Sequence, residues 1–363
     1  MEQPSHDEVE ITLFGPGYGE SVVVHLGDGC WIIVDSCYGA WCRSDPAPIW
    51  YLKQLGVNID AQVRLIVCSH WHDDHVGGLS DVVRQASQAP VYISQALRNE
   101  EFLTLLELYD RSPMDEPGIR QISGVFRQCR GGRLRFASQD RVLIAAAGHQ
   151  VSALSPSDLS VQDALAVFAN QARSLVPGSP PLRISSLRPN HTSVVLSIAN
   201  PHFQALLGAD LEVTAHSHRG WQAIIDSSTT LPERASFFKI PHHGSENGHH
   251  PEIWGSRLEP QVTAVLSPFK GGNVVLPLGR DVDRIRSLTD QAFATGVPRA
   301  KKAVLPAPVE KTVREMGKEV VELPQARGFV RARRRAAGLS SWRVDCFHEA
   351  GPLERLYPTD RAG

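Results

Sequence analysis

Four side chains of types that bind metal ions in proteins fall within six positions of the sequence: His70, His72, Asp74 and His75. The loop that carries them follows an apolar run at residues 63–68 and ends in a glycine pair. Side chains two residues apart point the same way in an extended segment, so His70 and His72 can hold one ion. Asp74 and His75 can then turn back toward a second ion. The spacing therefore predicts a site for two metal ions.

A polar surface loop is the competing explanation for a histidine-rich segment, and for a single histidine it is the usual one. Here three histidines and one aspartate occur together directly after a predicted strand. The glycine pair that follows them lies where a helix has to begin close to that strand. Chance seldom produces this combination, so the sequence favours metal binding.

Short strands and helices alternate on both sides of this loop and have to position it. Besides the strand at 63–68, β-rich runs predict hairpins at 9–34 and strands at 90–94, 193–198, 203–207, 235–240, 262–266 and 328–333. Helical patterns are predicted at 50–55, 77–88, 163–175, 221–226, 281–294 and 311–319. Residues 99–132 are mainly helical and predict an insertion, and residues 177–189 predict a long loop that can act as a lid. The alternation is typical of a layered α/β sandwich.

The composition is that of a globular protein with enough apolar material for a core. The 363 residues are 42% hydrophobic and 21% charged, and the formal net charge of -2 excludes a globally positive molecule. The first ten residues lack the pattern of a secretory signal, and no apolar run approaches membrane-spanning length. We therefore expect a cytoplasmic protein with no membrane partner. Six scattered cysteines do not suggest a disulfide scaffold.

Several segments together resemble a known family. The HxHxDH motif with its glycine pair resembles the signature of the metallo-β-lactamase superfamily, and the run GCWIIVD at 29–35 resembles an early strand of that fold. Farther along, NHTSVVL at 190–196, LLGAD at 206–210 and KIPHHGS at 239–245 resemble the competence-protein (ComEC-like) branch, which includes the hydrolase domain of a DNA-uptake protein. The resemblance extends over about residues 10 to 270.

This resemblance implies a fold and a domain organisation. The fold is an α/β metallo-β-lactamase αββα sandwich with a mainly helical insertion and a C-terminal extension. One hydrolase domain would span residues 1–335, with the insertion at about 99–132 and the extension at 336–363.

The resemblance also assigns roles to residues outside the first motif. Asp210 would bridge the two metals, although the helix N-cap is a strong alternative for an isolated aspartate, and many relatives have Gly-Asp where this chain has Gly-Ala-Asp. His243 would be the last ligand, and His242 would position the substrate or move protons, with the two roles exchangeable. Asp35 would support the metal-binding loop.

The third histidine of the first metal position is the least defined part of the predicted site. The Gly-His-Thr segment of many relatives is absent, and His191 is the nearest substitute in chain order. His149 is the rival, in a stretch that looks structural in the competence-protein branch. We rank His191 first.

Two divalent cations at such a site predict a hydrolase. They lower the pKa of a bridging water so that hydroxide forms at neutral pH, and Asp74 would orient that hydroxide. Histidine-rich ligation favours Zn²⁺, and the oxygen ligands allow Mn²⁺. By resemblance, the leading substrates are phosphodiesters, which makes the protein a phosphodiesterase or nuclease.

Basic residues late in the chain offer limited support for a nucleic-acid partner. They are Lys301, Lys302, Arg327, Arg331, Arg333, Arg334 and Arg335. Arginine suits phosphate oxygens, but a solvated basic edge is the more common explanation of such a cluster. Two other functions remain open. One is hydrolysis of a small ester, lactone or cyclic nucleotide, and the other is a metal-stabilised interaction module that docks a protein partner through the insertion or the C-terminal tail.

Overall fold

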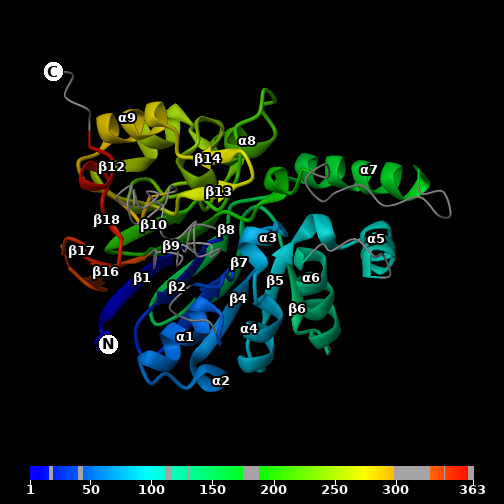
Figure 1. The fold of residues 1–363 in the computed structure, drawn as a ribbon, viewed down its shortest axis with the longest axis horizontal. Helices are drawn as coiled ribbons and strands as arrows, with labels where there is room; N and C mark the ends of the chain where they lie inside the picture. Colours follow the sequence, from blue (N-terminus) through cyan, green and yellow to red (C-terminus); the bar gives the residue numbers. More distant parts are fainter. Residues whose placement is uncertain are drawn as a thin grey trace, which may run out of the picture.

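Two eight-stranded β-sheets form the centre of the molecule (Figure 1). The computed structural model describes residues 1–15, 19–39, 44–110, 117–129, 131–174, 188–297, 328–338 and 340–358. The first sheet has the order β17 (Arg343–Phe347), β16 (Phe329–Arg335), β1 (Glu8–Phe14), β2 (Ser21–His25), β3 (Trp31–Val34), β4 (Val63–Val67), β5 (Val91–Ser94) and β6 (Leu134–Ala137). Its strands are parallel from β3 to β6 and antiparallel elsewhere.

The second sheet and a small hairpin complete the described strands. The sheet has the order β18 (Gly351–Pro352), β15 (Ala292–Ala294), β12 (Leu258–Leu266), β11 (Ala235–Lys239), β10 (Phe203–Leu207), β9 (Leu196–Asn200), β8 (His149–Ala153) and β7 (Arg141–Ala146). Strands β10, β11, β12 and β15 are parallel neighbours. The hairpin consists of β13 (Phe269–Gly271) and β14 (Val274–Leu276).

Helices cover the outer face of each sheet (Figure 1). Those on the first sheet are α1 (Ala47–Gln54), α2 (Ile59–Gln62), α3 (Asp73–Val76), α4 (Leu79–Gln85), α5 (Glu100–Asp110), α6 (Pro117–Gln128) and α7 (Asp158–Ser174). Those on the second sheet are α8 (Gly220–Ser227), α9 (Gly279–Leu288) and α11 (Leu353–Leu356). Among the described residues, no helix combines the length and the apolarity needed to cross a membrane.

Alternation along the strands explains the layers. Val22 and Val24 on β2 pack into the core between the sheets, whereas Val23 packs against the helices on the other side. On β10, Leu207 enters the same central core and Leu206 enters the outer core beneath α8 and α9. Because successive side chains of a strand point to opposite faces, both faces of each sheet are apolar and both need cover. The result is the predicted αββα sandwich.

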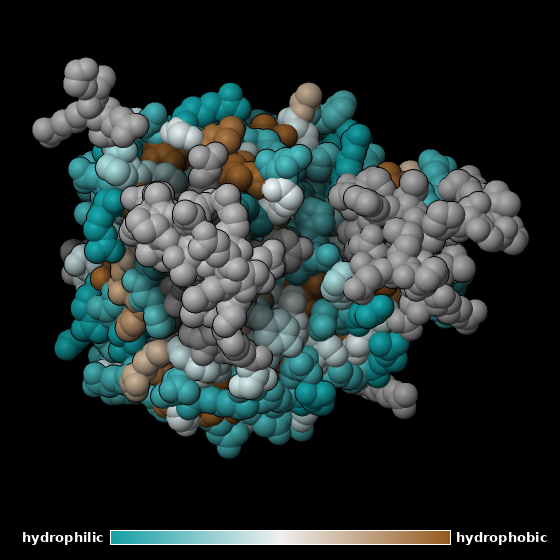
Figure 2. Space-filling view, in the orientation of Figure 1, coloured by the Kyte–Doolittle hydropathy of each residue, from teal (hydrophilic) through white to brown (hydrophobic). Residues whose placement is uncertain are grey.

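The hydropathy of the surface is consistent with apolar residues that pack inside the molecule. The face in Figure 2 is mostly hydrophilic, and hydrophobic residues gather near its top, where α9 and β14 lie. Val274 and Leu278 are among the exposed large hydrophobic residues, at 52% and 43% exposure.

Most predicted elements are present, and one prediction was wrong. The helix predicted at 281–294 ends at Leu288, and Ala292–Ala294 forms β15. Pairing with β12 in the sheet overrides the helical preference of the two alanines. The predicted helix at 311–319 and most of the predicted lid at 177–189 lie outside the described residues. The segment predicted as an insertion forms α5 and α6.

The last strands of the chain belong to the two sheets. Most arginines of the basic cluster late in the sequence make contacts within the protein. Strand β17 pairs with β16 in the first sheet, and β18 pairs with β15 in the second. Arg331 pairs with Asp345, and the guanidinium group of Arg334 lies 4.7 Å from the ring centre of Phe203. Arg333 is buried and donates to Glu10 over 2.7 Å. These three arginines have structural roles, and Lys301, Lys302 and Arg327 lie outside the described residues.

Candidate metal centre

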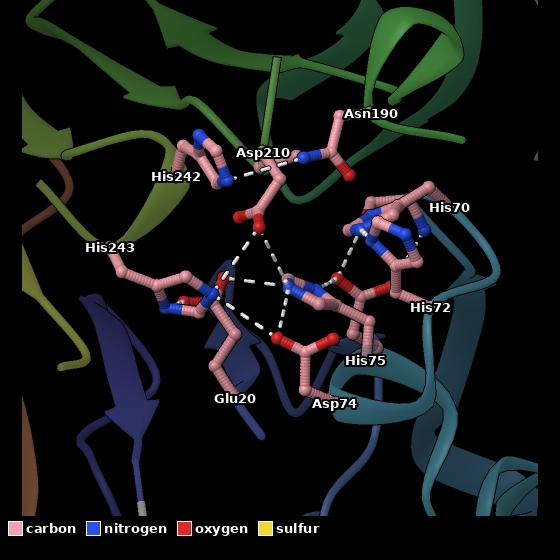
Figure 3. A network of polar contacts seen from close by, with 12 residues as sticks. Glu20, His70, His72, Asp74, His75, Asn190, Asp210, His242 and His243 are labelled. Carbon is pink, nitrogen blue, oxygen red and sulfur yellow. Dashed lines mark hydrogen bonds and ion pairs between the residues drawn. The ribbon is translucent and has the colours of Figure 1, made fainter. Parts of the chain in front are cut away.

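The two sheets meet at one edge where the ends of their parallel strands carry polar residues. The loop with the HxHxDH motif follows β4 in the first sheet. Asp210 follows β10, and the 3-10 turn η4 (His242–Gly244) follows β11 in the second sheet. A backbone hydrogen bond of 2.8 Å, from the Val194 N–H to the Ser69 carbonyl, joins the two sheets beside the loop. Residues far apart in the sequence therefore face one another here (Figure 3).

Four buried side chains form a cluster with metal-ligand geometry: Asp74, His75, Asp210 and His243. Nε2 of His243 lies 3.2 Å from Oδ2 of Asp74 and 3.3 Å from Oδ2 of Asp210. Nε2 of His75 lies 3.4 Å from the same oxygen of Asp210 and 3.7 Å from that of Asp74. Two ligands that are each about 2.05 Å from one ion at a tetrahedral angle are about 3.3 Å apart. The cluster therefore has the dimensions of a zinc-type site.

Hydrogen bonds on the far side of each ring determine which nitrogen faces the cluster. Nδ1 of His75 donates to Oδ2 of Asp35 over 2.8 Å, and Nδ1 of His243 donates to the Ser267 carbonyl over 2.9 Å. In both rings Nε2 is left to face the carboxylates. Among the described residues, Nε2 of His75 and Oδ1 of Asp210 are buried without a hydrogen-bond partner. Nε2 of His75 suits a bound cation, because a buried polar group without a partner costs free energy, whereas Oδ1 of Asp210 faces the ammonium group of Lys239.

His70 and His72 form a second pair beside this cluster. Ser69 Oγ donates to Asp35 over 2.6 Å, so it accepts from Nδ1 of His70 at 3.0 Å. Nε2 of His70 therefore carries the lone pair, and it faces Nδ1 of His72 at 3.2 Å. Two ring nitrogens at this distance are placed to share an ion. Asp35 accepts hydrogen bonds from Ser69 at the start of the loop and from His75 at its end. It therefore supports the metal-binding loop, as the sequence predicted.

Comparison with known proteins finds a family model that matches part of the chain. Residues 14–160 match the model of the metallo-beta-lactamase superfamily. This part of the chain is therefore similar to that superfamily. The two sheets with helices on both outer faces form the metallo-beta-lactamase fold that the sequence predicted. A search of curated proteins found no match.

Solved structures with the metallo-beta-lactamase fold are similar at low identity. A metallo-beta-lactamase from Cronobacter sakazakii with a substituted HARLDQ motif is 16% identical, and the match covers 57% of this chain and 63% of that chain with a TM-score of 0.32. The fold protein YhfI from Bacillus subtilis is 12% identical, with 79% and 95% covered and a TM-score of 0.38. MEM-A1, a subclass B3 enzyme from a soil metagenome library, is 16% identical, with 64% and 78% covered and a TM-score of 0.36.

Charge distinguishes the two histidine groups of this metallo-beta-lactamase fold. Burial lowers the pKa of His70 and His72, which leaves both rings neutral and able to bind a cation. Burial acts the same way on His243, but the carboxylates of Asp210 and Asp74 outweigh it and raise its pKa to about 10. The pKa of His75 is also raised well above its usual value, mainly by the same two carboxylates against burial. A divalent cation would replace the protons that these carboxylates hold on the two rings.

A buried ion pair lies behind the cluster and was not predicted as part of the site. Nζ of Lys239 contacts Oε1 of Glu20, donates to the Ala209 carbonyl over 2.9 Å and lies 3.7 Å from Oδ1 of Asp210. Burial would lower the pKa of Lys239, but Glu20 and Asp210 outweigh it, so the pKa is raised and the charge is kept. This positive charge holds the carboxylate of Asp210 in place.

The local backbone explains how Asp210 and His243 reach the cluster. Ala209, the extra residue relative to Gly-Asp, has a φ of 43°, and this left-handed turn brings Asp210 into the site. No helix begins at Asp210, since α8 begins at Gly220. His242 and His243 have φ values of 46° and 54°, and such strain occurs often at functional sites. The turn places His243 in the cluster, while the side chain of His242 is 16% exposed.

The two candidates for the third histidine are not part of the buried cluster. His191 in η3 (Pro189–Thr192) has a side chain 36% exposed, and its Nε2 lies 3.7 Å from Oε2 of Glu212. His149 in β8 bonds to the Ala147 carbonyl and to Asn200, away from the cluster. Neither joins a group of potential ligands among the described residues. Asn190, quoted in the sequence pattern without a role, lies at the site instead (Figure 3).

Proposed function

We propose that this protein is a metal-dependent hydrolase that uses two divalent cations, Zn²⁺ or Mn²⁺, to cleave phosphodiesters. The observation that carries the proposal is the convergence of buried ring nitrogens and carboxylate oxygens at ligand–ligand distances. Asp74, His75, Asp210 and His243 would hold one ion, and His70 and His72 would contribute to the other. When bound, such a pair of cations activates water and stabilises negative charge on the attacked group.

The side chains around the ions have separable roles in this proposal. Asp74 has a side chain 10% exposed, so one of its oxygens can accept a hydrogen bond from an attacking water molecule. His242 donates from Nδ1 to Oδ1 of Asn247 over 2.7 Å and accepts at Nε2 from Asn190. These two bonds hold its partly exposed ring at the rim of the site, where it can contact the substrate or a leaving group.

A cavity next to the site supports an anionic substrate. It has a volume of about 430 Å³ and is lined in part by Arg188, His191, His216 and Arg219. His191 connects it to the site through Glu212. Asp163 also lines the cavity and pairs with Arg219, so Arg188 is the basic side chain that suits phosphate oxygens there. The same volume also suits a small ester, lactone or cyclic nucleotide, which makes hydrolysis of a small molecule the second candidate.

The proposal is tested by metal-dependent cleavage of bis-p-nitrophenyl phosphate, single-stranded DNA, plasmid and RNA. We expect Zn²⁺ or Mn²⁺ to support cleavage, and Asp74→Ala and Asp210→Asn to lower the rate by about 100-fold or more, because each removes a carboxylate from the cluster. Asp45→Asn is the control, since this carboxylate pairs with Lys53 away from the site.

Other outcomes identify the alternatives. Cleavage of cyclic nucleotides, esters or lactones without cleavage of the polymers or the phosphodiester dye would replace the first candidate by the second. Stoichiometric metal binding with no cleavage of any substrate would contradict both and favour an interaction module.

A further inference from the structure

The orientation of the Asn190 amide is determined by its neighbours. Nδ2 of Asn190 lies 2.9 Å from Oε1 of Glu212 and 3.2 Å from Nε2 of His242. A carboxylate oxygen can only accept, so the NH₂ end of the amide has to face Glu212. His242 agrees, because its Nδ1 donates to Asn247 and leaves Nε2 as an acceptor. Oδ1 of Asn190 therefore points to the other side of the amide.

That oxygen has no partner within the described part of the protein. Asn190 is 7% exposed, and its Oδ1 is buried without a hydrogen bond. In Figure 3 the oxygen points to the side of the site where His70 and His72 lie. A buried acceptor without a partner is unfavourable, so an oxygen held in this way indicates a ligand.

The histidine pair lacks a third ligand of the expected kinds. Nε2 of His70 and Nδ1 of His72 face each other at 3.2 Å. Among the described residues, no third histidine, cysteine, aspartate or glutamate offers an atom within 4.8 Å of both. His191, the residue predicted for this position, has its Nε2 near Glu212 instead. An amide oxygen is the remaining kind of ligand, and divalent cations accept it.

We propose that Oδ1 of Asn190 is the third protein ligand of the ion held by His70 and His72, and that Glu212 and His242 hold the amide in position. This inference rests on the proposed dinuclear site and adds an asymmetry to it. The cluster around His75 has two carboxylates, whereas the Asn190 ligand is neutral. The ion beside Asn190 is therefore held more weakly, and the two ions bind in two separable steps.

The test is a titration of the metal-free protein with Zn²⁺, followed by calorimetry, and with Co²⁺, followed by visible absorption. We expect the wild type to bind two ions with different affinities. Asn190→Leu, which has a similar size but no oxygen, should weaken the second step at least about 10-fold and leave the first unchanged. His191→Ala is the matched control and should keep both steps.

Two results would overturn the inference. One is unchanged binding of both ions by Asn190→Leu, and the other is loss of the weaker ion in His191→Ala. If Asn190→Leu does not fold, the double variant Asn190→Asp with Glu212→Gln preserves the hydrogen bond and offers a charged oxygen. That variant should bind the weaker ion more tightly, and unchanged affinity would contradict the proposal.

The titration separates this inference from the proposed function because it needs no substrate. A protein that shows the expected metal binding but cleaves nothing contradicts the hydrolase and leaves Asn190 as a ligand. A protein that cleaves phosphodiesters and keeps both ions in Asn190→Leu contradicts only the role of Asn190.

Discussion

Buried histidines in this protein differ by what faces their ring nitrogens. His75 and His243 donate from Nδ1 and face carboxylates with Nε2, which is an arrangement for holding a cation. His25 is equally buried, but its Nδ1 donates to the Glu8 carbonyl over 2.9 Å and its Nε2 accepts from the Gly29 N–H. Its two nitrogens are satisfied by backbone groups, so His25 is structural. Partners, more than burial, therefore distinguish a ligand from a core histidine.

His25 should make stability depend on pH. Burial lowers its pKa from 6.5 to about 4, against the effect of the Glu8 carbonyl. Between those two pH values the unfolded chain binds a proton at His25 that the folded protein does not. The contribution of the neutral ring to the free energy of unfolding is therefore fully present above pH 6.5. It is lost as the pH falls to about 4, by about 3 kcal/mol in total. Urea unfolding across this range should show a smaller pH slope for His25→Gln than for the wild type. The exposed His202→Gln should keep the wild-type slope, and equal slopes for all three proteins would refute the effect.

Among the elements, β16 shows how a basic sequence becomes part of a core. Arg333 donates to Oε2 of Glu10 on the neighbouring β1, and the Tyr51 hydroxyl donates to Oε1 over 2.7 Å. Glu10 is fully buried, and these partners satisfy its carboxylate oxygens. Arg331 on the same strand pairs with the half-buried Asp345 on β17. Arg331 and Arg333 are two residues apart and lie on the same face of β16. Arg331 is opposite its acidic partner on β17, and Arg333 is opposite its acidic partner on β1.

The two ion pairs on β16 should differ in their contribution to stability. Glu10→Gln leaves the buried charge of Arg333 without its counter-charge, and we expect a loss of about 3 kcal/mol or more in the free energy of unfolding. Asp345→Asn removes a carboxylate that is 35% exposed and should cost less than about 1 kcal/mol. Urea unfolding of both variants at pH 7 measures the difference. A loss for Glu10→Gln no larger than that for Asp345→Asn would show that the buried pair is not needed.

In the whole molecule, the metal centre joins the two halves of the sandwich. The first sheet supplies His70, His72, Asp74 and His75 on the loop after β4, and the second supplies Asp210 and His243 after β10 and β11. No ligand set of this kind exists in the unfolded chain, so metal binding favours the folded state.

Removal of metal should therefore lower the stability of the whole fold. With free Zn²⁺ at about 100 times its dissociation constant, one site adds about 2.7 kcal/mol to the free energy of unfolding. We expect the melting temperature to fall on treatment with a chelator and to recover when Zn²⁺ is restored. Asp210→Asn should respond much less, because it lacks a carboxylate between the sheets. A melting temperature independent of metal in the wild type would contradict this link.

The sequence by itself determined the local parts of the site. His70, His72, Asp74 and His75 lie on one short loop, so their spacing alone brings them together. The strands around them were predictable because apolar alternation and β-branched runs are local properties. The match to the superfamily over residues 14–160 agrees with that reading.

Only the tertiary structure decided the parts that depend on distant neighbours. Glu20 and Lys239 are 219 positions apart, and nothing in either local sequence indicates that they pair. Asn190 and His191 are adjacent, and the backbone of η3 together with Glu212 decides which of them faces the site. Residues 292–294 form a strand because β12 lies beside them. In each case a contact between separate elements supplies the energy that decides the outcome. The local propensity of the residues carries no information about such contacts.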